Sequence, residues 1–228
     1  SFRYKQLDSL FLAAYTLCLP VMSVFTRQTA IMVNAEHASG KSRFVSGLIG
    51  GTGFPSINIV ASALAMQGYT AASIRQQRNN SSLTLCLEEF EDYGGMDAKS
   101  VAVRKVLELC RDLISEGAVN WSIGTTSGES RTYHLKFPLV CCAIRPLRDA
   151  ASLSRFIGFE LVKDSARQDP VYVLETTYGK EGIAKIRHQV AIALLPHMPR
   201  LRALQKEIES EFTKEKVLPA HASSRFAE

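Results

Sequence analysis

Eight consecutive residues, Ala35–Ser42 (AEHASGKS), have the types and the spacing of a loop that binds phosphate groups. Such a loop needs small residues, so that successive backbone N–H groups can point at the anion, and a following helix whose dipole adds positive potential. It also needs a lysine for the β- and γ-phosphates and a hydroxyl for Mg²⁺. Lys41 and Ser42 supply these two groups, and Gly40 precedes them. We therefore predict that this stretch binds a nucleotide.

The remaining residues of this loop leave two points open. Alanine stands at Ala35, where glycine is usual, but the position requires a small residue more than it requires glycine. His37 is expected to contribute its backbone N–H rather than a catalytic imidazole, and no second histidine or cysteine stands at metal-ligand spacing from it. The alternative is an ordinary helix-start loop that binds nothing. The predicted nucleotide contacts are Ala35, Glu36, His37, Ala38, Ser39, Gly40, Lys41, Ser42 and Arg43.

Two acidic residues follow the apolar run Leu83–Leu87 (LTLCL). Hydrolysis of ATP at such a site needs one carboxylate at a strand end to hold the Mg²⁺ shell and a second to polarise the attacking water. We assign the first role to Glu88 and the second to Glu89. The usual first acid is aspartate, which is shorter than Glu88 by one methylene. The alternative is that both acids cap a strand and face solvent.

Two arginines stand where they could meet phosphate charge. The apolar run Phe137–Ile144 ends at Arg145, and a polar side chain at such a strand tip can sense the γ-phosphate. Arg155 lies in the sequence Ser154-Arg155-Phe156, at the junction of a short predicted helix and the next strand. An arginine there can act on the site of a neighbouring subunit and stabilise transition-state charge. The alternative for both is an ordinary surface arginine.

Four further cations are candidates for contact with nucleic acid. Arg75 and Arg78 lie in a short predicted helix, where the alternative is that they are solvated helix arginines. Arg131 and Lys136 lie near the turn TTSGESRTYH, which resembles a protruding hairpin. An ordinary surface hairpin is the alternative there.

Strands alternate with helices along most of the chain, which favours a three-layer α/β fold with a mainly parallel sheet of five strands. The predicted strands are Thr29–Asn34, Ile57–Ala61, Leu83–Leu87, Phe137–Ile144 and Phe156–Val162, with a hairpin formed by Trp121–Ile123 and Thr132–Phe137. The predicted helices are Leu7–Leu19, Lys41–Ile49, Thr70–Arg78 with Thr70 as its N-cap, Lys99–Glu116, Asp149–Arg155, Glu181–Leu194 and Arg200–Phe212.

These elements divide the chain into four parts. We expect an N-terminal helical segment at 1–26, the α/β core at 27–165, a C-terminal helical segment at 166–215 and a flexible tail at 216–228. The chain begins without methionine, which suggests a piece excised from a longer protein.

The composition is that of an ordinary globular protein, with 46% hydrophobic residues and a net charge of +5. This mild basic excess suits a polyanionic partner but identifies none. The five cysteines lie mostly in apolar runs without CxxC spacing, which favours buried free thiols in a reducing, cytoplasmic compartment. Apolar runs fall short of a membrane span, so no membrane partner is expected.

Taken in order, AEHASGKS, LCLEEFED, FPLVCCAIRPL and SRF resemble the ATPase core of phage and plasmid replication proteins, the primase-helicase-type members of the AAA+ and related additional-strand ATPases. The resemblance covers Leu10–Lys163. It implies a P-loop fold and an oligomeric, often hexameric, motor that uses ATP and Mg²⁺ to move along or remodel single- or double-stranded DNA in a bacterial or phage-infected cell. By motif match, Lys41 and Ser42 would bind phosphate and Mg²⁺, Glu88 the metal shell, and Arg155 the neighbouring site.

Three functions remain open at this point. The first is a DNA-dependent ATPase, as the helicase module of a replication protein. The second is a genome-packaging motor, which uses the same loop and acids. The third is a nucleotide-binding module that does not hydrolyse ATP and serves as an oligomerisation switch, which the departures at Ala35 and Glu88 motivate.

Overall fold

The structure is a computed structural model. It describes residues 10–12, 14–16, 18–19, 21–25, 28–37, 39, 41, 57–60, 70–88, 90, 98–124, 128–144, 154–161, 176–179, 182, 185, 189–190 and 192–214, with only the backbone at 57–60, 88, 99, 116 and 212–214.

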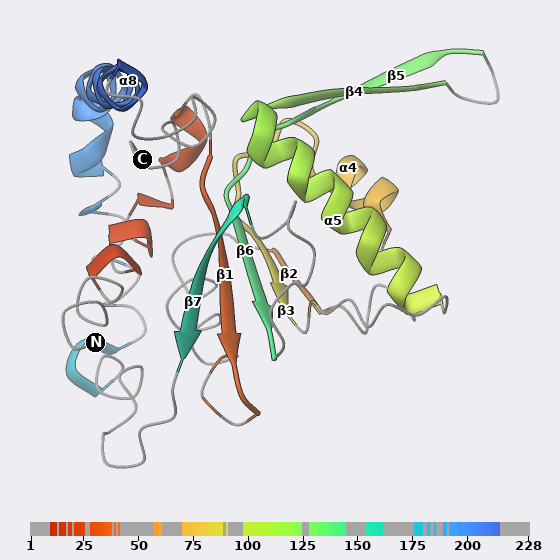
Figure 1. Ribbon diagram of the computed structural model, residues 1–228, viewed down its shortest axis with the longest axis horizontal. Helices are drawn as coiled ribbons and strands as arrows, with labels where there is room; N and C mark the ends of the chain where they lie inside the picture. The colour runs from red at the N-terminus through yellow and green to blue at the C-terminus, as the bar shows by residue number, and fades with distance from the viewer. Residues whose placement is uncertain are drawn as a thin grey trace.

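A parallel sheet forms the centre of the molecule (Figure 1). Its strand order is β2-β3-β6-β1-β7, and every neighbouring pair runs parallel. The mixed α/β class with a mainly parallel sheet is therefore confirmed. The strands are β1 (Ala30–Ala35), β2 (Ile57–Val60), β3 (Leu85–Glu88), β6 (Leu139–Ala143) and β7 (Phe156–Leu161).

Helical segments cover both faces of this sheet. On one face lie α4 (Ala71–Arg78) and the long α5 (Ala98–Glu116). On the other face lie the N-terminal segment, which includes the 3₁₀ turn η1 (Met22–Val24), and the C-terminal helix α8 (Met198–Lys214), preceded by the 3₁₀ turn η3 (Leu195–His197) (Figure 1).

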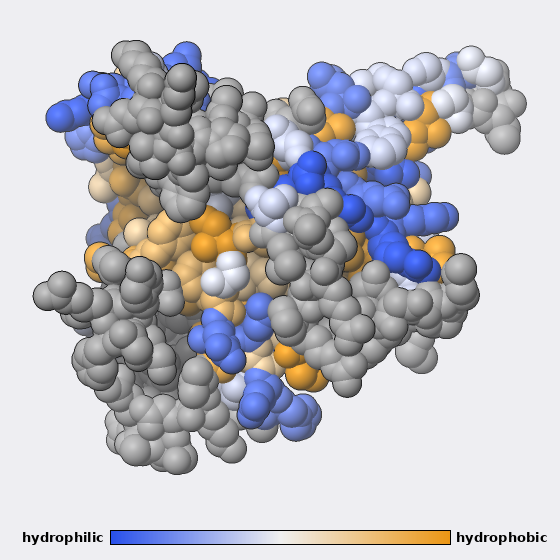
Figure 2. Space-filling model, viewed as in Figure 1, coloured by the Kyte–Doolittle hydropathy of each residue, from blue (hydrophilic) through white to orange (hydrophobic). Residues whose placement is uncertain are grey.

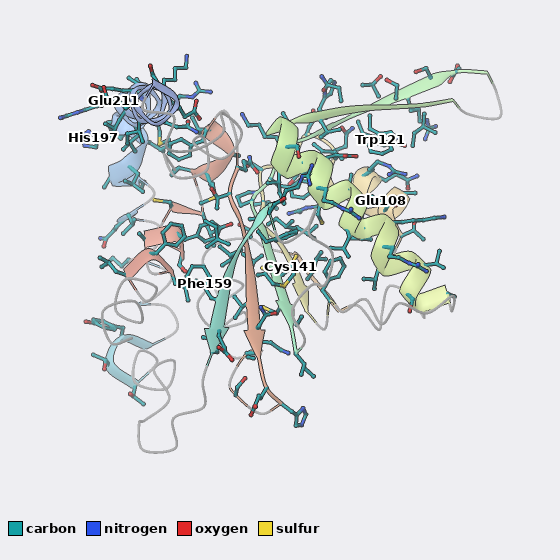
Figure 3. The ribbon with its side chains drawn as sticks, in the orientation of Figure 1. Glu108, Trp121, Cys141, Phe159, His197 and Glu211 are labelled. Carbon is teal, nitrogen blue, oxygen red and sulfur yellow. The ribbon has the colours of Figure 1, made fainter. Side chains whose placement is uncertain are left out.

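The strand residues alternate between two apolar cores, as a period of two requires. In β1, Ala30 and Met32 belong to the core under α4 and α5, whereas Ile31 and Val33 belong to the core under the N-terminal segment and α8. Figure 3 shows Cys141 on the α5 side of the sheet and Phe159 on the opposite side. The strands β1 and β6 at the centre of the sheet are thus buried on both faces, which accounts for their nearly continuous apolar sequences.

The N-terminal segment is bonded to the amino end of the sheet through the side chain of Tyr15. The Tyr15 hydroxyl lies 2.8 Å from the Thr29 carbonyl oxygen and 3.1 Å from that of Leu139, and it shares its proton between them. Phe11 stacks on Tyr15 and on Phe159 of β7, with ring centroids 6.4 and 5.7 Å apart. The described positions from 10 to 18 are helical, as the sequence predicts.

The N-cap predicted at Thr70 is confirmed. The Ser73 N–H donates to the Thr70 hydroxyl at 3.2 Å, and the Thr70 N–H donates to the Ser73 hydroxyl at 2.9 Å. This reciprocal pair satisfies two backbone donors that the first turn of α4 would otherwise leave unbonded.

Two strands of the central sheet begin two residues later than predicted, each for a local reason. The strand β3 begins at Leu85 rather than Leu83, because the carbonyl groups of Leu83 and Thr84 accept hydrogen bonds from the Arg78 guanidinium. The strand β6 begins at Leu139 rather than Phe137, because Pro138 has no N–H to give to a ladder.

The predicted hairpin is present, but its first strand is longer than predicted and its second strand begins and ends two residues earlier. The strands β4 (Val119–Gly124) and β5 (Ser130–Leu135) pair antiparallel in a separate two-stranded sheet. Figure 1 shows this hairpin starting near the C-terminal end of α5 and extending away from the body above that helix.

The predicted helix Arg200–Phe212 corresponds to α8. Much of three other predicted elements, Lys41–Ile49, Asp149–Arg155 and Glu181–Leu194, and all of the tail lie outside the described residues. Residues 154 and 155, predicted as the end of a helix, form a turn instead. The division at 26, 165 and 215 stays a prediction.

Candidate functional site

The predicted phosphate loop and acid pair begin at the same edge of the sheet. Because all five strands run parallel, their carboxyl ends lie together, and Ala35 ends β1 as Glu88 ends β3. Only β6 lies between these two strands, so their backbones are about 10 Å apart. The last residues of β1 and β3 therefore lie on either side of β6.

This edge is also where the chain changes direction. From β1 the chain continues to β2 at one border of the sheet, and from β6 it continues to β7 at the other border. The connections therefore leave the neighbours β1 and β6 in opposite directions. In open parallel sheets, ligands bind at such a switch point, outside the carboxyl ends of the strands.

The loop after β1 makes a tight turn. The Ser39 N–H donates to the Glu36 carbonyl oxygen at 3.3 Å, and the backbone is helical at Lys41. The side chains of Glu36 and His37 are exposed. The other predicted contacts of this loop, Ala38, Gly40, Ser42 and Arg43, lie outside the described residues.

The geometry explains why alanine is tolerated at Ala35. This residue is the last of the extended strand β1, where it pairs with Leu161 of β7, and it is 97% buried. Among the described residues, Asn80 is the one non-glycine residue with a positive φ angle, so Ala35 needs no conformation reserved for glycine.

The backbone on both sides of Glu89 is hydrogen-bonded to the sheet. Glu88 pairs with Val60 of β2, one position beyond the row formed by Leu87 and Cys141. The chain is held against β6 again at Phe90, whose N–H donates to the Cys142 carbonyl oxygen at 2.9 Å. The side chain of Glu88 and the whole of Glu89 lie outside the described residues, so their roles stay predictions.

Two buried oxygen atoms at this edge have no hydrogen-bond partner among the described residues: Asn34 Oδ1 and Ser39 Oγ. Asn34 stands one residue before Ala35, in register with Ala143 of β6 and Glu160 of β7. Buried polar atoms are normally bonded, and an exception calls for a ligand, an ion or a water. These oxygens therefore fit a group that brings its own donors, such as a hydrated Mg²⁺ bound with a nucleotide.

The contribution of Asn34 was not predicted from the sequence. In the run AIMVN, Asn34 is the polar residue at the end of a buried strand. Its position beside the tip of β6 follows from the strand order, which the local sequence does not show. By contrast, β6 itself ends in the apolar residues Ala143 and Ile144, and Ile144 is 45% exposed. The predicted contact Arg145 follows directly and lies outside the described residues.

Arg155 lies at the opposite edge of the sheet. It precedes Phe156, which pairs with Ala30 at the start of β1, and its Nε donates to the Ser115 hydroxyl of α5 at 2.8 Å. The six residues of β1 place Arg155 about 20 Å from the loop of its own chain. The guanidinium can therefore serve a phosphate site only in another copy of the chain.

The hairpin has two different faces. One carries polar side chains that bond across the strands: His134 Nδ1 lies 2.5 Å from Asn120 Oδ1, and the Ser122 and Thr132 hydroxyls are 3.0 Å apart. The other carries partly buried apolar side chains, including Trp121, which pack against the core.

The two predicted nucleic-acid contacts at the hairpin differ in exposure. Arg131 is exposed on β5, where it pairs with Ile123. Lys136 is half-buried, and burial together with the nearby Arg202 of α8 lowers the pKa of its ammonium group below the usual 10.5. Lys136 and Arg202 together form a basic surface where the hairpin meets the body.

The two arginines of α4 are engaged within the chain. Arg78 is 99% buried, donates to the carbonyl oxygens of Leu83 and Thr84, and lies 5.5 Å from the ring centre of Phe137. Its prediction as a nucleic-acid contact is wrong, because the side chain is inaccessible. The Arg75 guanidinium lies over the Trp121 ring at 4.6 Å, and burial lowers its pKa.

All five cysteines are free thiols, and four are fully buried, as predicted. Burial raises the pKa of Cys141 well above its usual value, and the hydrogen bond to Cys110 adds to this. Across the described part of the chain, no three His, Cys, Asp or Glu side chains gather into a group that could hold a metal. None of the helices described is long and apolar enough to cross a bilayer.

Comparison with known proteins gives distant structural likenesses and no sequence relative. No protein-family model and no curated protein matches the chain. Among solved structures, the chain is similar to JCV helicase, crystallised with a bound phenyl-acetamide compound, at 14% identity and a TM-score of 0.37. The match covers 86% of this chain and 59% of that one. A likeness of this strength assigns no function to the chain.

Proposed function

We propose that this chain is the ATP-binding and ATP-hydrolysing core of a DNA motor of the replicative helicase or primase-helicase type. One observation carries the proposal. The loop with Lys41 follows β1, the acid pair begins at the end of β3, and both ends meet at the switch point of a parallel sheet with β6 between them.

Each residue at this edge has a role that its chemistry supports. The Lys41 ammonium would neutralise the β- and γ-phosphates, and the backbone N–H groups of the loop would orient them. Glu89 would orient the attacking water and accept its proton. Ser42 and Glu88 would hold Mg²⁺, which when bound neutralises phosphate charge. Arg145 would contact the γ-phosphate.

DNA would be met on the side of the molecule that carries the hairpin. Arg131 is exposed there, and Lys136 and Arg202 add positive charge at its base. The net charge of +5 suits such a partner. Since Arg155 can reach a phosphate site only in another copy, the motor would work as an oligomer, such as a hexameric ring.

A nucleotide-binding switch without hydrolysis is the second candidate. The observation that favours it is the apolar tip of β6, where Ala143 and Ile144 offer no polar group to a γ-phosphate. Glutamate at Glu88 in place of the usual aspartate points the same way.

Phosphate release, measured with and without single-stranded DNA, separates these functions. For the motor we expect DNA-stimulated turnover that Lys41→Ala and Glu89→Gln both abolish, with nucleotide binding retained in Glu89→Gln. Binding of ATP without turnover under any condition would support the switch. Absence of nucleotide binding would exclude both. Strand separation of a forked duplex then distinguishes a helicase from a packaging motor, which moves along duplex DNA without opening it.

A further inference from the structure

The hairpin is held to the body by contacts from the C-terminal end of α4. The His134 N–H donates to Asn79 Oδ1 at 2.8 Å, and the Asn80 N–H donates to the His134 carbonyl oxygen at 2.9 Å. Four residues earlier, the Arg75 guanidinium lies over the ring of Trp121 on β4. Figure 3 shows Trp121 on the hairpin above α4. Both strands of the hairpin are therefore fixed by one helix end.

The backbone after α4 is shaped for this contact. Asn80 has a φ angle of 57°, in the left-handed region that asparagine adopts more readily than most residues. The chain turns sharply there, and the Ser81 N–H bonds back to the Arg78 carbonyl oxygen at 3.0 Å. This turn brings Asn79 and Asn80 against the outer edge of β5, where they occupy the place of a further strand.

The same helix end also holds the start of β3. The Arg78 guanidinium donates to the carbonyl oxygens of Leu83 and Thr84, the two residues that immediately precede Leu85. From Leu85 the strand runs for only four residues to Glu88. The hairpin and the acid-bearing strand thus share one support, which we call the α4 clamp: Arg75, Arg78, Asn79 and Asn80.

We propose that the α4 clamp transmits the binding of nucleic acid on the hairpin to the ATP site at the end of β3. This inference rests on the proposed function and names how that site is regulated. Nucleic acid that displaces the hairpin pulls on Asn79 and Arg75, and through Arg78 on the residues before β3. Because β3 is an extended strand of only four residues, a shift of its start is carried to Glu88 at its other end.

The hairpin is also joined to the sheet covalently, and the effect of this link must be distinguished from the effect of the α4 clamp. The chain passes directly from Leu135 at the end of β5 through three residues to β6, the strand that ends before Arg145. If the hairpin acts through this covalent link alone, the contacts of α4 are dispensable for stimulation. The test therefore removes clamp contacts and leaves the covalent link intact.

The decisive comparison is Asn79→Ala against Asn79→Asp. Alanine removes the oxygen that accepts from the His134 N–H, whereas aspartate keeps an acceptor there. Gln76→Ala, an exposed position of the same helix, is the matched control, and Arg75→Met removes the cation over Trp121. Trp121 is the single tryptophan of the chain, so acrylamide quenching of its fluorescence reports directly on docking of the hairpin.

Phosphate release is then measured in each variant with and without a single-stranded oligothymidine. We expect basal turnover within about twofold of wild type in all variants, and stimulation by the oligonucleotide reduced about fivefold in Asn79→Ala and Arg75→Met, the factor that one lost hydrogen bond represents. Asn79→Asp and Gln76→Ala should be stimulated like wild type. Quenching of Trp121 should increase only in the two impaired variants.

One result overturns the inference while leaving the proposed function standing, namely full stimulation in Asn79→Ala although Trp121 quenching shows an undocked hairpin. A wild-type protein whose turnover ignores the oligonucleotide, or that releases no phosphate at all, fails the proposed function itself. If Arg75→Met does not fold, Asn79→Ala against Asn79→Asp decides alone.

Discussion

At the scale of single residues, Asn34 is the side chain whose importance the sequence alone conceals. Its Oδ1 atom is buried without a partner among the described residues, beside Ala143 at the switch point of the sheet. An asparagine amide can accept a hydrogen bond from water and donate one to a phosphate oxygen. We infer that Asn34 assists Glu89 in positioning the attacking water, because Ala143 at the tip of β6 offers no polar side chain there.

Asn34→Ala should therefore slow hydrolysis about tenfold, the effect of losing one hydrogen bond to a charged group, while nucleotide affinity stays within about twofold. Single-turnover phosphate release and binding of a fluorescent ATP analogue measure the two quantities. Met32→Leu is the control, because it changes the same face of β1 without a polar atom. Equal losses of binding and turnover would mean that Asn34 acts only on the ground state or the fold.

Arg78 is a residue whose role the sequence misidentifies. A pattern of arginines on a short helix predicts a charged surface, whereas this guanidinium satisfies two backbone carbonyls inside the molecule. Burial lowers the pKa of Arg78, yet the group keeps its charge at neutral pH. Charge-assisted hydrogen bonds of this kind are stronger than neutral ones.

Replacing Arg78 should lower the free energy of unfolding. Arg78→Met keeps an unbranched stem but leaves the carbonyls of Leu83 and Thr84 without donors, so we expect a loss of about 2–4 kcal/mol in the free energy of unfolding. Urea unfolding followed by Trp121 fluorescence measures this loss. Gln77→Met, an exposed neighbour in α4, should change stability by less than about 0.5 kcal/mol. An Arg78→Met variant as stable as wild type would contradict the structural role.

At the scale of elements, periodicity predicts what strands and helices bury, but not how they end. The helix α5 and the strand β7 follow their predicted ranges closely, because their apolar patterns are long or strictly buried. The starts of β3 and β6 were wrong by two residues each, since a guanidinium and a proline decide them. Strand order depends on tertiary contacts, so the proximity of Asn34 to Ala143 could not be predicted locally.

The contact between β6 and α5 predicts a dependence of stability on pH. Burial raises the pKa of Cys141 well above its usual 9.0, so the folded protein keeps the thiol proton at a pH where the unfolded chain loses it. The folded state then binds more protons than the unfolded state, and stability falls as the pH rises above about 9. Below that pH the contribution is fully present.

Urea unfolding between pH 7 and pH 10.5 tests this sign. The slope attributable to one thiol is at most about 1.4 kcal/mol per pH unit. Cys141→Ala should lose stability at pH 7, because it leaves a gap against α5, but its stability should decline less steeply above pH 9 than that of wild type. Parallel curves for the two proteins would show that Cys141 does not titrate on unfolding.

At the scale of the whole molecule, the sheet separates two predicted parts of one active site. The loop lies at the carboxyl edge, whereas Arg155 lies at the amino edge, about 20 Å away along β1. A chain that uses both must assemble head to tail, and such contacts close into a ring when the rotation permits. The proposed site is therefore incomplete in a single copy.

Mixing two inactive variants tests this arrangement. Arg155→Ala subunits keep the loop and Glu89, and Glu89→Gln subunits keep Arg155, so each should be inactive alone. In a random equal mixture, about one site in four pairs an intact Glu89 with an intact neighbouring Arg155, and turnover should recover to about a quarter of wild type. Wild-type protein diluted with the double variant is the control for exchange. If mixed oligomers form without recovery, Arg155 does not serve the neighbouring site.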